Sequence, residues 1–362
     1  MEIAVIGGGN GAYATAADLA EKGHSVRLWR RNKEAFQPVL ENQSLVLKDS
    51  QGGRRVRLTL ASMDMAAVID GAEMVVIPLP ATAQESLVSD LAPHLKDGQI
   101  VFLPPGTFGS YVIARGLRDR GSRADVVFAE TGTLPYLCRK HGPDTIAITT
   151  RATRLPVGVF PAEKSEYAFG ILKRAFPVVE PLKDVLDGAL MNAGPIIHPP
   201  LMILNAGPIE HFDYWDIHNE GTQPAVRRVH DALDAERISV REALGYGAPH
   251  FPLADHYNPE GEEWMYGNAA HEKLVDSTDW REKLDLVNHR YIREDIACGL
   301  AFLVSVADWV GVRTPVARGL LSVASAIVGE DLRATGRTLE NLKLANMTPG
   351  EMNSMLRKGV LP

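Results

Sequence analysis

The chain has 362 residues, which is enough for two domains of ordinary size. Apolar residues make up 45% of it and charged residues 23%, a balance that excludes a largely disordered chain. The 38 basic and 45 acidic residues give a net charge of −7, which excludes a general nucleic-acid binder.

The cysteine content and the apolar segments indicate the compartment. Cys138 and Cys298 are too few for a disulfide framework or a cysteine-based zinc site, so we expect reduced thiols in a cytoplasmic protein. A strand signal begins at Glu2, which leaves no room for a secretory leader. The two longest apolar segments, 189–209 and 297–312, are interrupted by prolines and by an aspartate respectively. We expect both to be buried helices and not membrane spans.

Strand and helix signals alternate through the first half of the chain. A β-rich run at 2–6 precedes a glycine turn, an alanine-rich helical stretch follows at 12–22, and a second strand is expected at 25–29. Further strands are expected at 44–48, 56–60, 74–78, 100–103 and 126–129, edge strands at 145–149 and 157–160, and helices at 63–69, 84–95 and 109–120. Repeated strand–helix units predict an α/β fold with a doubly wound parallel sheet.

From about residue 183 strand signals nearly vanish and helical stretches dominate. These helices are expected at 185–208, 225–244, 291–310, 315–328 and 348–358. The polar segment 249–279 has only weak periodicity and receives no element. We therefore predict two domains, an α/β domain over 1–183 and a mostly α-helical domain over 184–362.

The strongest single motif is the glycine-rich turn 6–12, which fits G-x-G-x-x-A between a strand and a helix. Gly7 permits the tight turn, Gly9 lets the backbone approach a pyrophosphate, and Ala12 lets the helix pack closely on the strand. The helix N-terminus adds amide donors, so this arrangement predicts a Rossmann domain that binds a dinucleotide. The expected cofactor-binding residues of the turn are Gly7, Gly9, Asn10, Gly11 and Ala12.

The residues that follow the second strand favour NADP(H) over NAD(H). An NAD-binding domain typically carries an acidic residue about 20 positions after the glycines, where it binds the ribose 2′-hydroxyl. Here Arg30 and Arg31 occupy that stretch, and no carboxylate appears before Glu34. Two adjacent arginines suit a 2′-phosphate, which guanidinium groups can grip with paired hydrogen bonds. The alternative is a solvated basic turn.

Three further loops follow strands of the predicted sheet and should reach the same edge. Pro78 and Leu79 follow one strand and Pro105 follows the next, which predicts rigid backbone beside the nicotinamide. Ordinary turn chemistry explains these prolines equally well. Glu130 follows a later strand and could either bind a cationic substrate group or cap a helix.

Three ionisable residues stand out in the helical half. His198 lies in the apolar, proline-broken segment 192–200, where a buried structural histidine is the alternative to a functional one. Arg290 and Asp295 open a long apolar helix. A spacing of five residues offsets two α-helical side chains by about 140°, so both can face one point only if Arg290 precedes the helix proper. A carboxylate on the imidazole would fix its tautomer and raise its basicity, but spacing alone does not pair His198 with Asp295.

The sequence resembles the opine dehydrogenase family, which includes octopine, nopaline and N-(1-carboxyethyl)norvaline dehydrogenases. The resemblance covers nearly the whole chain. It rests on the glycine turn, Glu130-Thr131 with Cys138-Arg139, the segment from Asn192 to His198-Pro199, Asp234-Ala235-Glu236-Arg237, Arg290-Tyr291 with Glu294-Asp295, and Gly336-Arg337-Thr338-Leu339-Glu340. The His-Pro and Arg-Tyr-x-x-Glu-Asp elements are much more specific than the glycine turn.

The resemblance implies an NAD(P)H-dependent oxidoreductase acting on CH–NH bonds. Members of the family reductively condense an α-keto acid, such as pyruvate, with the amino group of an amino acid, and the product is an opine. For this chain the resemblance implies that His198 is the acid/base, that Asp295 orients it, and that Arg290 pairs with a substrate carboxylate. Glu130 is implied as a contact to the amino substrate.

Two departures from the family pattern affect specificity. Arg30 and Arg31 stand where NAD-preferring members carry an acid, which supports NADP(H). The segment 249–279 shows no usable likeness, so the amine and the keto acid stay open, as do the stereochemistry and the direction of the reaction. The expected partners are these small molecules, with no nucleic acid and no membrane. A homodimer is possible.

Rival interpretations are a keto acid reductase, a cofactor sensor and a metal enzyme. Ketopantoate reductases and 3-hydroxyacid dehydrogenases use a lysine acid on the first helix after the boundary, but 185–208 contains no lysine and Lys183 precedes it. A non-catalytic NADP(H)-binding sensor predicts that His198, Arg290 and Asp295 do not converge. No metal is expected, because the sets His250, Asp255, His256 and His211, Asp213, His218 have no recognised ligand spacing.

Overall fold

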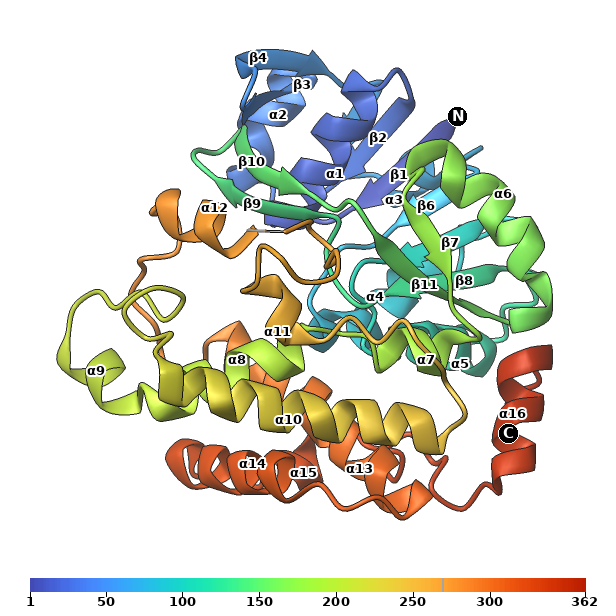
Figure 1. Ribbon diagram of the computed structural model, residues 1–362. Coiled ribbons are helices and arrows are strands. Elements are labelled where there is room, and N and C mark those ends of the chain that lie inside the picture. Colours follow the sequence, from blue (N-terminus) through green and yellow to red (C-terminus); the bar gives the residue numbers. More distant parts are fainter. Residues whose placement is uncertain (269) are drawn as a thin grey trace. The chain divides into compact units, whose positions relative to one another are not determined.

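The computed structural model describes residues 1–268 and 270–362, and they group into two compact units (Figure 1). The α/β unit consists of Met1–Ala189 with Ser354–Pro362, and the helical unit consists of Leu190–Asn353. An α/β part followed by a mostly helical part confirms the predicted fold class. The functional boundary at residue 183 stays a prediction.

The α/β unit is built on an eight-stranded sheet in the order β12-β11-β8-β7-β6-β1-β2-β5. Its strands are β1 (Glu2–Ile6), β2 (Ser25–Trp29), β5 (Leu60–Ser62), β6 (Met74–Val76), β7 (Ile100–Leu103), β8 (Val127–Thr131), β11 (Leu155–Phe160) and β12 (Val179–Pro181). Neighbouring strands run parallel except β8 and β11, which are antiparallel. Residues 3–6 of β1 are fully buried, as expected of a parallel strand that is covered on both faces.

Helices connect these strands. They are α1 (Asn10–Glu21), η1 (Glu34–Phe36), α2 (Gln37–Asn42), α3 (Met65–Ile69), α4 (Ala81–Leu91), α5 (Gly109–Asp119), η2 (Ala162–Lys164), α6 (Ser165–Ala175) and α7 (Val185–Ala189). Of these, α1 is the helix that follows the glycine turn, and its alanines are buried against the strands. Small side chains let this helix lie close to the sheet, which fixes the position of its N-terminus.

A second, four-stranded sheet has the order β4-β3-β10-β9. Its strands are β3 (Ser44–Asp49), β4 (Gly52–Arg57), β9 (Tyr136–Lys140) and β10 (Thr145–Arg151). Strands β3 and β4 form an antiparallel hairpin, and β4 begins earlier in the chain than the strand expected at 56–60. The strand expected at 145–149 does not lie at the edge of the main sheet, because as β10 it pairs in parallel with β3 and antiparallel with β9.

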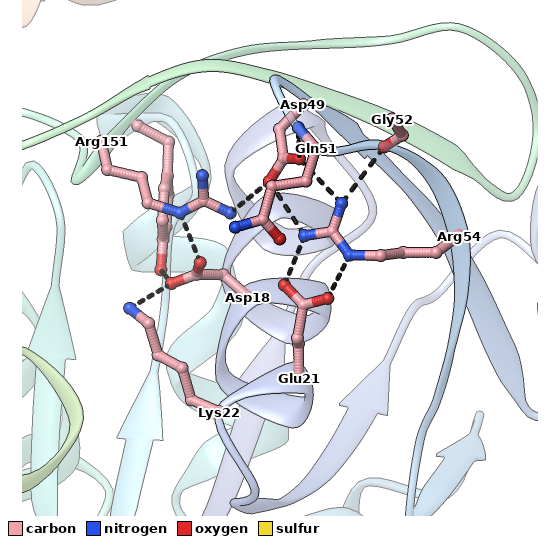
Figure 2. A network of polar contacts seen from close by, with 9 residues as sticks. Asp18, Glu21, Lys22, Asp49, Gln51, Gly52, Arg54 and Arg151 are labelled. Atoms are coloured by element: carbon pink, nitrogen blue, oxygen red, sulfur yellow. Dashed lines mark hydrogen bonds and ion pairs between the residues drawn. The ribbon is translucent and has the colours of Figure 1, made fainter.

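A network of charged side chains ties this second sheet to α1 (Figure 2). Asp18 of α1 is buried and accepts a hydrogen bond of 2.7 Å from Nε of Arg151. Arg151 also donates to Asp49 of β3 at 2.9 Å, and Asp49 accepts a further bond of 2.7 Å from Arg54 of β4. Arg54 in turn pairs with Glu21 near the end of α1. Since each buried charge has a partner, the network holds α1 and the second sheet in one arrangement.

In the helical unit the helices expected at 225–244, 315–328 and 348–358 match the structure closely, whereas the stretches 185–208 and 291–310 are each divided. The helices of this unit are α8 (Gly194–Leu204), α9 (Ala206–His211), α10 (Pro224–Ala243), α11 (Leu253–His256), α12 (Ala270–Asp276), the π-helix η3 (Tyr291–Leu300), α13 (Ala301–Val310), α14 (Pro315–Val328) and α15 (Leu332–Thr335). The last helix, α16 (Pro349–Lys358), begins in this unit and ends in the other. No described helix is both long enough and apolar enough to cross a membrane.

Two predictions for this region are corrected. The single helix expected at 185–208 is divided into α7, α8 and α9, with breaks near Gly194 and Asn205. Pro195 suits the first turn of α8, where a missing amide hydrogen costs nothing, and so starts a new helix. The segment 249–279 carries α11 and α12, and its residue 269 lies outside the described residues.

Candidate active site

A histidine–carboxylate pair lies in the helical unit. Nδ1 of His198 on α8 is 2.8 Å from Oδ2 of Asp295 on η3, and the two side chains are 14% and 8% exposed. When Asp295 is ionised it can only accept, so Nδ1 carries the hydrogen and proton exchange with a ligand would use Nε2. The structure therefore brings together two residues that sequence spacing alone could not pair.

Two glycines allow α8 and η3 to approach this closely. A side chain at Gly194 would clash with the carboxylate of Asp295, and one at Gly299 would clash with the ring of Pro195. Gly194 on α8 thus leaves room for a side chain of η3, and Gly299 on η3 leaves room for a side chain of α8. The close packing holds the histidine and the aspartate at hydrogen-bond distance.

The winding of η3 decides where Arg290 lies. Arg290 immediately precedes the π-helix Tyr291–Leu300, and the amide of Ala301 donates to the carbonyl of Ile296, five residues earlier. In a π-helix hydrogen bonds join residues five apart, so such residues lie above one another. The offset of about 140° expected for an α-helix therefore does not apply. Arg290 is an exposed residue, and it lies close enough to Asp295 for its positive charge to lower the pKa of that carboxyl.

The electrostatics of the pair follow from burial. Burial raises the pKa of Asp295 to about 7, and the positive charge of Arg290 offsets only part of that rise. The carboxyl group consequently gains or loses its proton near neutral pH. A carboxylate poised in this way beside an imidazole can support acid–base chemistry in the physiological range.

Two rings pack against the imidazole of His198, and a third packs against one of them. The ring of Tyr291 stacks on the imidazole with centroids 3.6 Å apart and planes inclined by 15°. His218 meets the imidazole edge-on at 5.8 Å, and Trp280 in turn meets His218 edge-on at 5.3 Å. Stacked and edge-on rings of this kind restrict the rotation of the imidazole.

Sequence reasoning missed this aromatic cluster of Tyr291, His218 and Trp280. The only signal for Tyr291 was its place in the Arg-Tyr-x-x-Glu-Asp element. His218 was considered only as a candidate metal ligand, and the described residues contain no group of three or more side chains that could hold a metal ion. Trp280 lies in a polar segment without usable periodicity.

In the α/β unit, the glycine turn has the shape that a pyrophosphate requires. Gly7 adopts a φ of 139°, and a side chain there would crowd Leu79. Gly9 caps α1 with no side-chain hydrogen bond, and a Cβ at this position would meet no atom within 4 Å. The first turn of α1, which begins at Asn10, is thus open to an approaching anion. These residues fit a dinucleotide.

Arg30 and Arg31 follow β2 as predicted, but they differ in environment. Arg30 is half-buried, and its Nη1 donates to the hydroxyl of Tyr13 at 2.9 Å and to the carbonyl of Ala35 at 2.8 Å. Its side chain covers Gly8, since a Cβ on that glycine would meet it. Arg31 is exposed. One arginine is therefore already fixed beside the glycine turn.

The remaining predicted residues of this unit follow the central strands. Pro78 and Leu79 come after β6, and Pro105 comes after β7. The loop after β7 is held by the amide of Gly106, which donates to the carbonyl of Thr131, and by Gln84, which donates to the carbonyl of Gly106 at 3.0 Å. Because β1, β6 and β7 are parallel neighbours, these loops reach the same edge as the glycine turn.

The carboxylate of Glu130 is held by backbone amides at the start of a helix. Glu130 is fully buried at the end of β8, and its two carboxylate oxygens accept hydrogen bonds from the amides of Phe108 (2.6 Å) and Ser110 (3.0 Å). These amides belong to the N-terminus of α5. The geometry matches the helix-capping alternative that the sequence left open.

Two family models match the chain. The model described as NAD/NADP octopine/nopaline dehydrogenase, alpha-helical domain, matches residues 181–328, and the N-terminal model of NAD-dependent glycerol-3-phosphate dehydrogenase matches residues 2–122. The opine dehydrogenase of Arthrobacter sp. (strain 1C) is 26% identical over 358 residues, which cover 97% of each chain. Nearly the whole chain therefore aligns with a protein of this kind.

Solved structures show the same fold. Octopine dehydrogenase in complex with NADH and agmatine matches with a TM-score of 0.71 at 19% identity, covering 99% of this chain and 98% of that one. Yersinopine dehydrogenase with NADP+ bound matches with a TM-score of 0.67 at 16% identity, over 99% of this chain and 98% of its own. These structures show the shared fold alone. The matched helical-domain model, with the likeness to an opine dehydrogenase over 97% of the chain, places this protein in the opine dehydrogenase family of NAD(P)-dependent oxidoreductases that act on CH–NH bonds.

Proposed function

We propose that this protein uses NADPH to condense an α-keto acid reductively with the amino group of an amino acid or amine. The observation that carries the proposal is the His198–Asp295 pair, with Arg290 immediately before the π-helix that carries Asp295. A cofactor sensor would not need this convergence. The reaction joins keto acid and amine with loss of water to give an imine, and addition of a hydride and a proton to that imine gives a secondary amine.

His198 is the proposed acid/base. Held by Asp295 at Nδ1, its ring would use Nε2 to donate a proton to the oxygen that leaves as water. Asp295 acts through the imidazole, since it fixes the tautomer and balances the charge that develops when His198 is protonated. The stack with Tyr291 keeps the ring in this orientation.

Arg290 is the proposed partner of the keto acid's carboxylate. Arg290 is an exposed residue, and its backbone is fixed at the start of the π-helix. A guanidinium can grip a carboxylate with two parallel hydrogen bonds, which fixes the orientation of the carbonyl as well as its position. A small α-keto acid such as pyruvate fits this requirement.

The cofactor site is proposed to lie at the sheet edge of the α/β unit. Amides at Gly9, Asn10, Gly11 and Ala12 would bind the pyrophosphate, and the backbone at Pro78, Leu79 and Pro105 would lie beside the nicotinamide. Arg30 and Arg31 would bind the 2′-phosphate, which makes NADPH the preferred cofactor. When bound, the cofactor supplies the hydride. A cytoplasmic location and a homodimer stay predictions.

Product analysis tests the proposal. The protein is incubated with NADPH deuterated at the transferred position, pyruvate and pooled amino acids, and the products are analysed by mass spectrometry. The expected product has the combined mass of keto acid and amine, less one water, and carries one added hydrogen and one deuterium. Deuterium found in a hydroxy acid instead would contradict the proposal. A protein with His198→Ala serves as the matched control.

A further inference from the structure

A second cation, Lys140, lies at the glycine turn, and the roles assigned above do not use it. Its amide donates a 3.0 Å hydrogen bond to Oδ1 of Asn10, which fixes the end of β9 against the start of α1. Its Nζ lies 3.4 Å from the carbonyl oxygen of Gly8 and 3.8 Å from the centroid of the Tyr13 ring. The side chain therefore extends along the turn that receives the cofactor.

Arg30 reaches the same place from β2. It donates to the hydroxyl of Tyr13 and covers Gly8, so Tyr13 and Gly8 each contact both cations. These two cations come from different sheets: Arg30 follows β2 of the eight-stranded sheet, and Lys140 ends β9 of the second sheet. The chain thus builds a two-cation site around one tyrosine and one glycine.

Neither cation has an acidic partner among the described residues. No carboxylate forms an ion pair with Arg30 or Lys140, whereas the nearby basic residues Lys22, Arg54 and Arg151 are each paired. Two neighbouring positive charges without a counter-charge repel each other, and half-burial strengthens that repulsion. This arrangement is unfavourable by itself and becomes favourable once an anion lies between the two groups.

The titration of Lys140 agrees with this geometry. Burial and, to a smaller extent, the positive charge of Arg30 lower its pKa to about 8, while Asp144 acts in the opposite direction. The neighbouring phenol of Tyr13 is held neutral, because burial raises its pKa despite the hydrogen bond from Arg30. A bound anion would restore the proton of Lys140.

We propose that Lys140 binds the 2′-phosphate of NADP(H) together with Arg30 and is a determinant of cofactor choice. The inference rests on the proposed preference for NADPH. The end of β2 is where a Rossmann domain reads the 2′ position of the adenosine ribose, and Arg30 lies there. The pyrophosphate, in contrast, binds at the helix N-terminus, where backbone amides serve it.

Binding measurements with paired ligands test this site. Dissociation constants for NADPH and NADH are measured by fluorescence on wild-type protein and on Lys140→Met, which keeps the apolar stem on Tyr13. Competition with 2′,5′-ADP and with ADP separates the 2′-phosphate from the pyrophosphate. Loss of one charge-assisted contact should raise Kd for NADPH and 2′,5′-ADP by about 10- to 100-fold while leaving NADH and ADP within about 2-fold.

Lys173→Met is the matched control, because Lys173 is an exposed lysine on α6 of the same unit. This variant should bind all four ligands as the wild type does. Circular dichroism and a melting curve establish that the Lys140 variants fold. Since the readout is binding, an inactive but NADPH-selective protein would refute the proposed reaction while leaving this site intact.

The pH dependence provides a second test. In the wild type, affinity for NADPH should be full below about pH 8 and fall above it, because free Lys140 loses its proton there while the 2′-phosphate requires it. Lys140→Arg keeps its charge and should bind NADPH equally at about pH 7 and pH 9. An equal loss of NADH and NADPH affinity in Lys140→Met would overturn the proposal, as would unchanged NADPH binding or a wild type that prefers NADH.

Discussion

The carboxylate of Asp295 and the imidazole of His198 meet at 2.8 Å because η3 is wound as a π-helix and packs on α8 through Gly194 and Gly299. Arg290 immediately precedes this π-helix, and its charge acts on Asp295. The proposed acid/base and the proposed carboxylate-binding cation thus lie on or beside the same π-helix. π-Helical turns are uncommon and occur frequently at functional sites, which agrees with this placement.

Replacement of His198 by alanine should reduce kcat by about 10²- to 10⁴-fold, the contribution typical of general acid catalysis. Binding of NADPH should be unchanged, because the proposed cofactor residues all lie in the α/β unit. Steady-state kinetics and fluorescence titration check the two expectations. A near-normal kcat would remove the acid/base role from His198.

The pH profile should carry the signature of Asp295. Burial raises the pKa of this carboxyl to about 7, so it is ionised above that pH and protonated below it. Only the ionised form carries the negative charge that stabilises protonated His198, and kcat should therefore fall as the pH falls through about 7. The Asp295→Asn variant should have a low kcat at every pH, and its kcat should not fall further as the pH drops below about 7. An unchanged fall of kcat in the variant would assign it to another group.

Arg290→Gln should raise KM for the keto acid by about 10- to 100-fold, because it removes a charged, two-point contact to the carboxylate. Kd for NADPH should stay at the wild-type value. Arg290→Lys keeps the charge and loses the planar fork, so its KM should lie between the two. Substrate titrations of the three proteins decide the matter, and equal KM values would exclude Arg290 from carboxylate binding.

Replacement of both Arg30 and Arg31 by alanine should raise KM for NADPH and leave KM for NADH unchanged. The reason is that the two cofactors differ only in the 2′-phosphate that these residues are proposed to bind. Parallel kinetics with each cofactor provide the measurement. An equal effect on NADH and NADPH would remove the argument from the basic residues after β2.

Much of the fold was predictable from the sequence, and what was missed has physical causes. The strands β1, β2, β6 and β7 are continuous apolar runs, and such runs identify buried parallel strands directly. The second sheet was missed because β10 pairs with β3 of a hairpin that lies far away in the chain, and β9 joins the sheet only through β10. Local periodicity carries no information on pairing at that separation.

The candidate site shows the same division. His198, Arg290 and Asp295 were chosen from residue type and from the family motifs, and the structure brings them together. The π-helix was not predicted. Over about two turns, an apolar stretch has the same sequence pattern whether it forms an α-helix or a π-helix. The stacking of Tyr291 depends on contacts between helices, which a single sequence does not reveal.

Acid should destabilise the helical unit through its buried histidines. Burial lowers the pKa of His230 to about 4 and that of His256 to about 3, so both stay neutral in the folded state at pH 5. The unfolded chain takes up protons below about pH 6.5, and stability is therefore lost as the pH falls from there toward 4. For His230 alone the loss approaches about 3 kcal/mol.

Urea unfolding at about pH 7 and pH 5 measures this loss. Replacement of His230 by Gln keeps a donor for the carbonyl of Ile197 and removes the titration. The difference in unfolding free energy between the two pH values should be smaller in His230→Gln than in the wild type. An identical difference in both proteins would show that His230 does not contribute.

The central claim is reductive condensation of two substrates, and the dependence of the rate on both of them tests it most directly. NADPH oxidation is followed by absorbance with pyruvate alone, with pooled amino acids alone, and with both. We predict turnover only when both are present, and subdivision of the pool would then identify the amine. Equal rates with pyruvate alone and with the mixture would contradict the claim and indicate a hydroxyacid dehydrogenase.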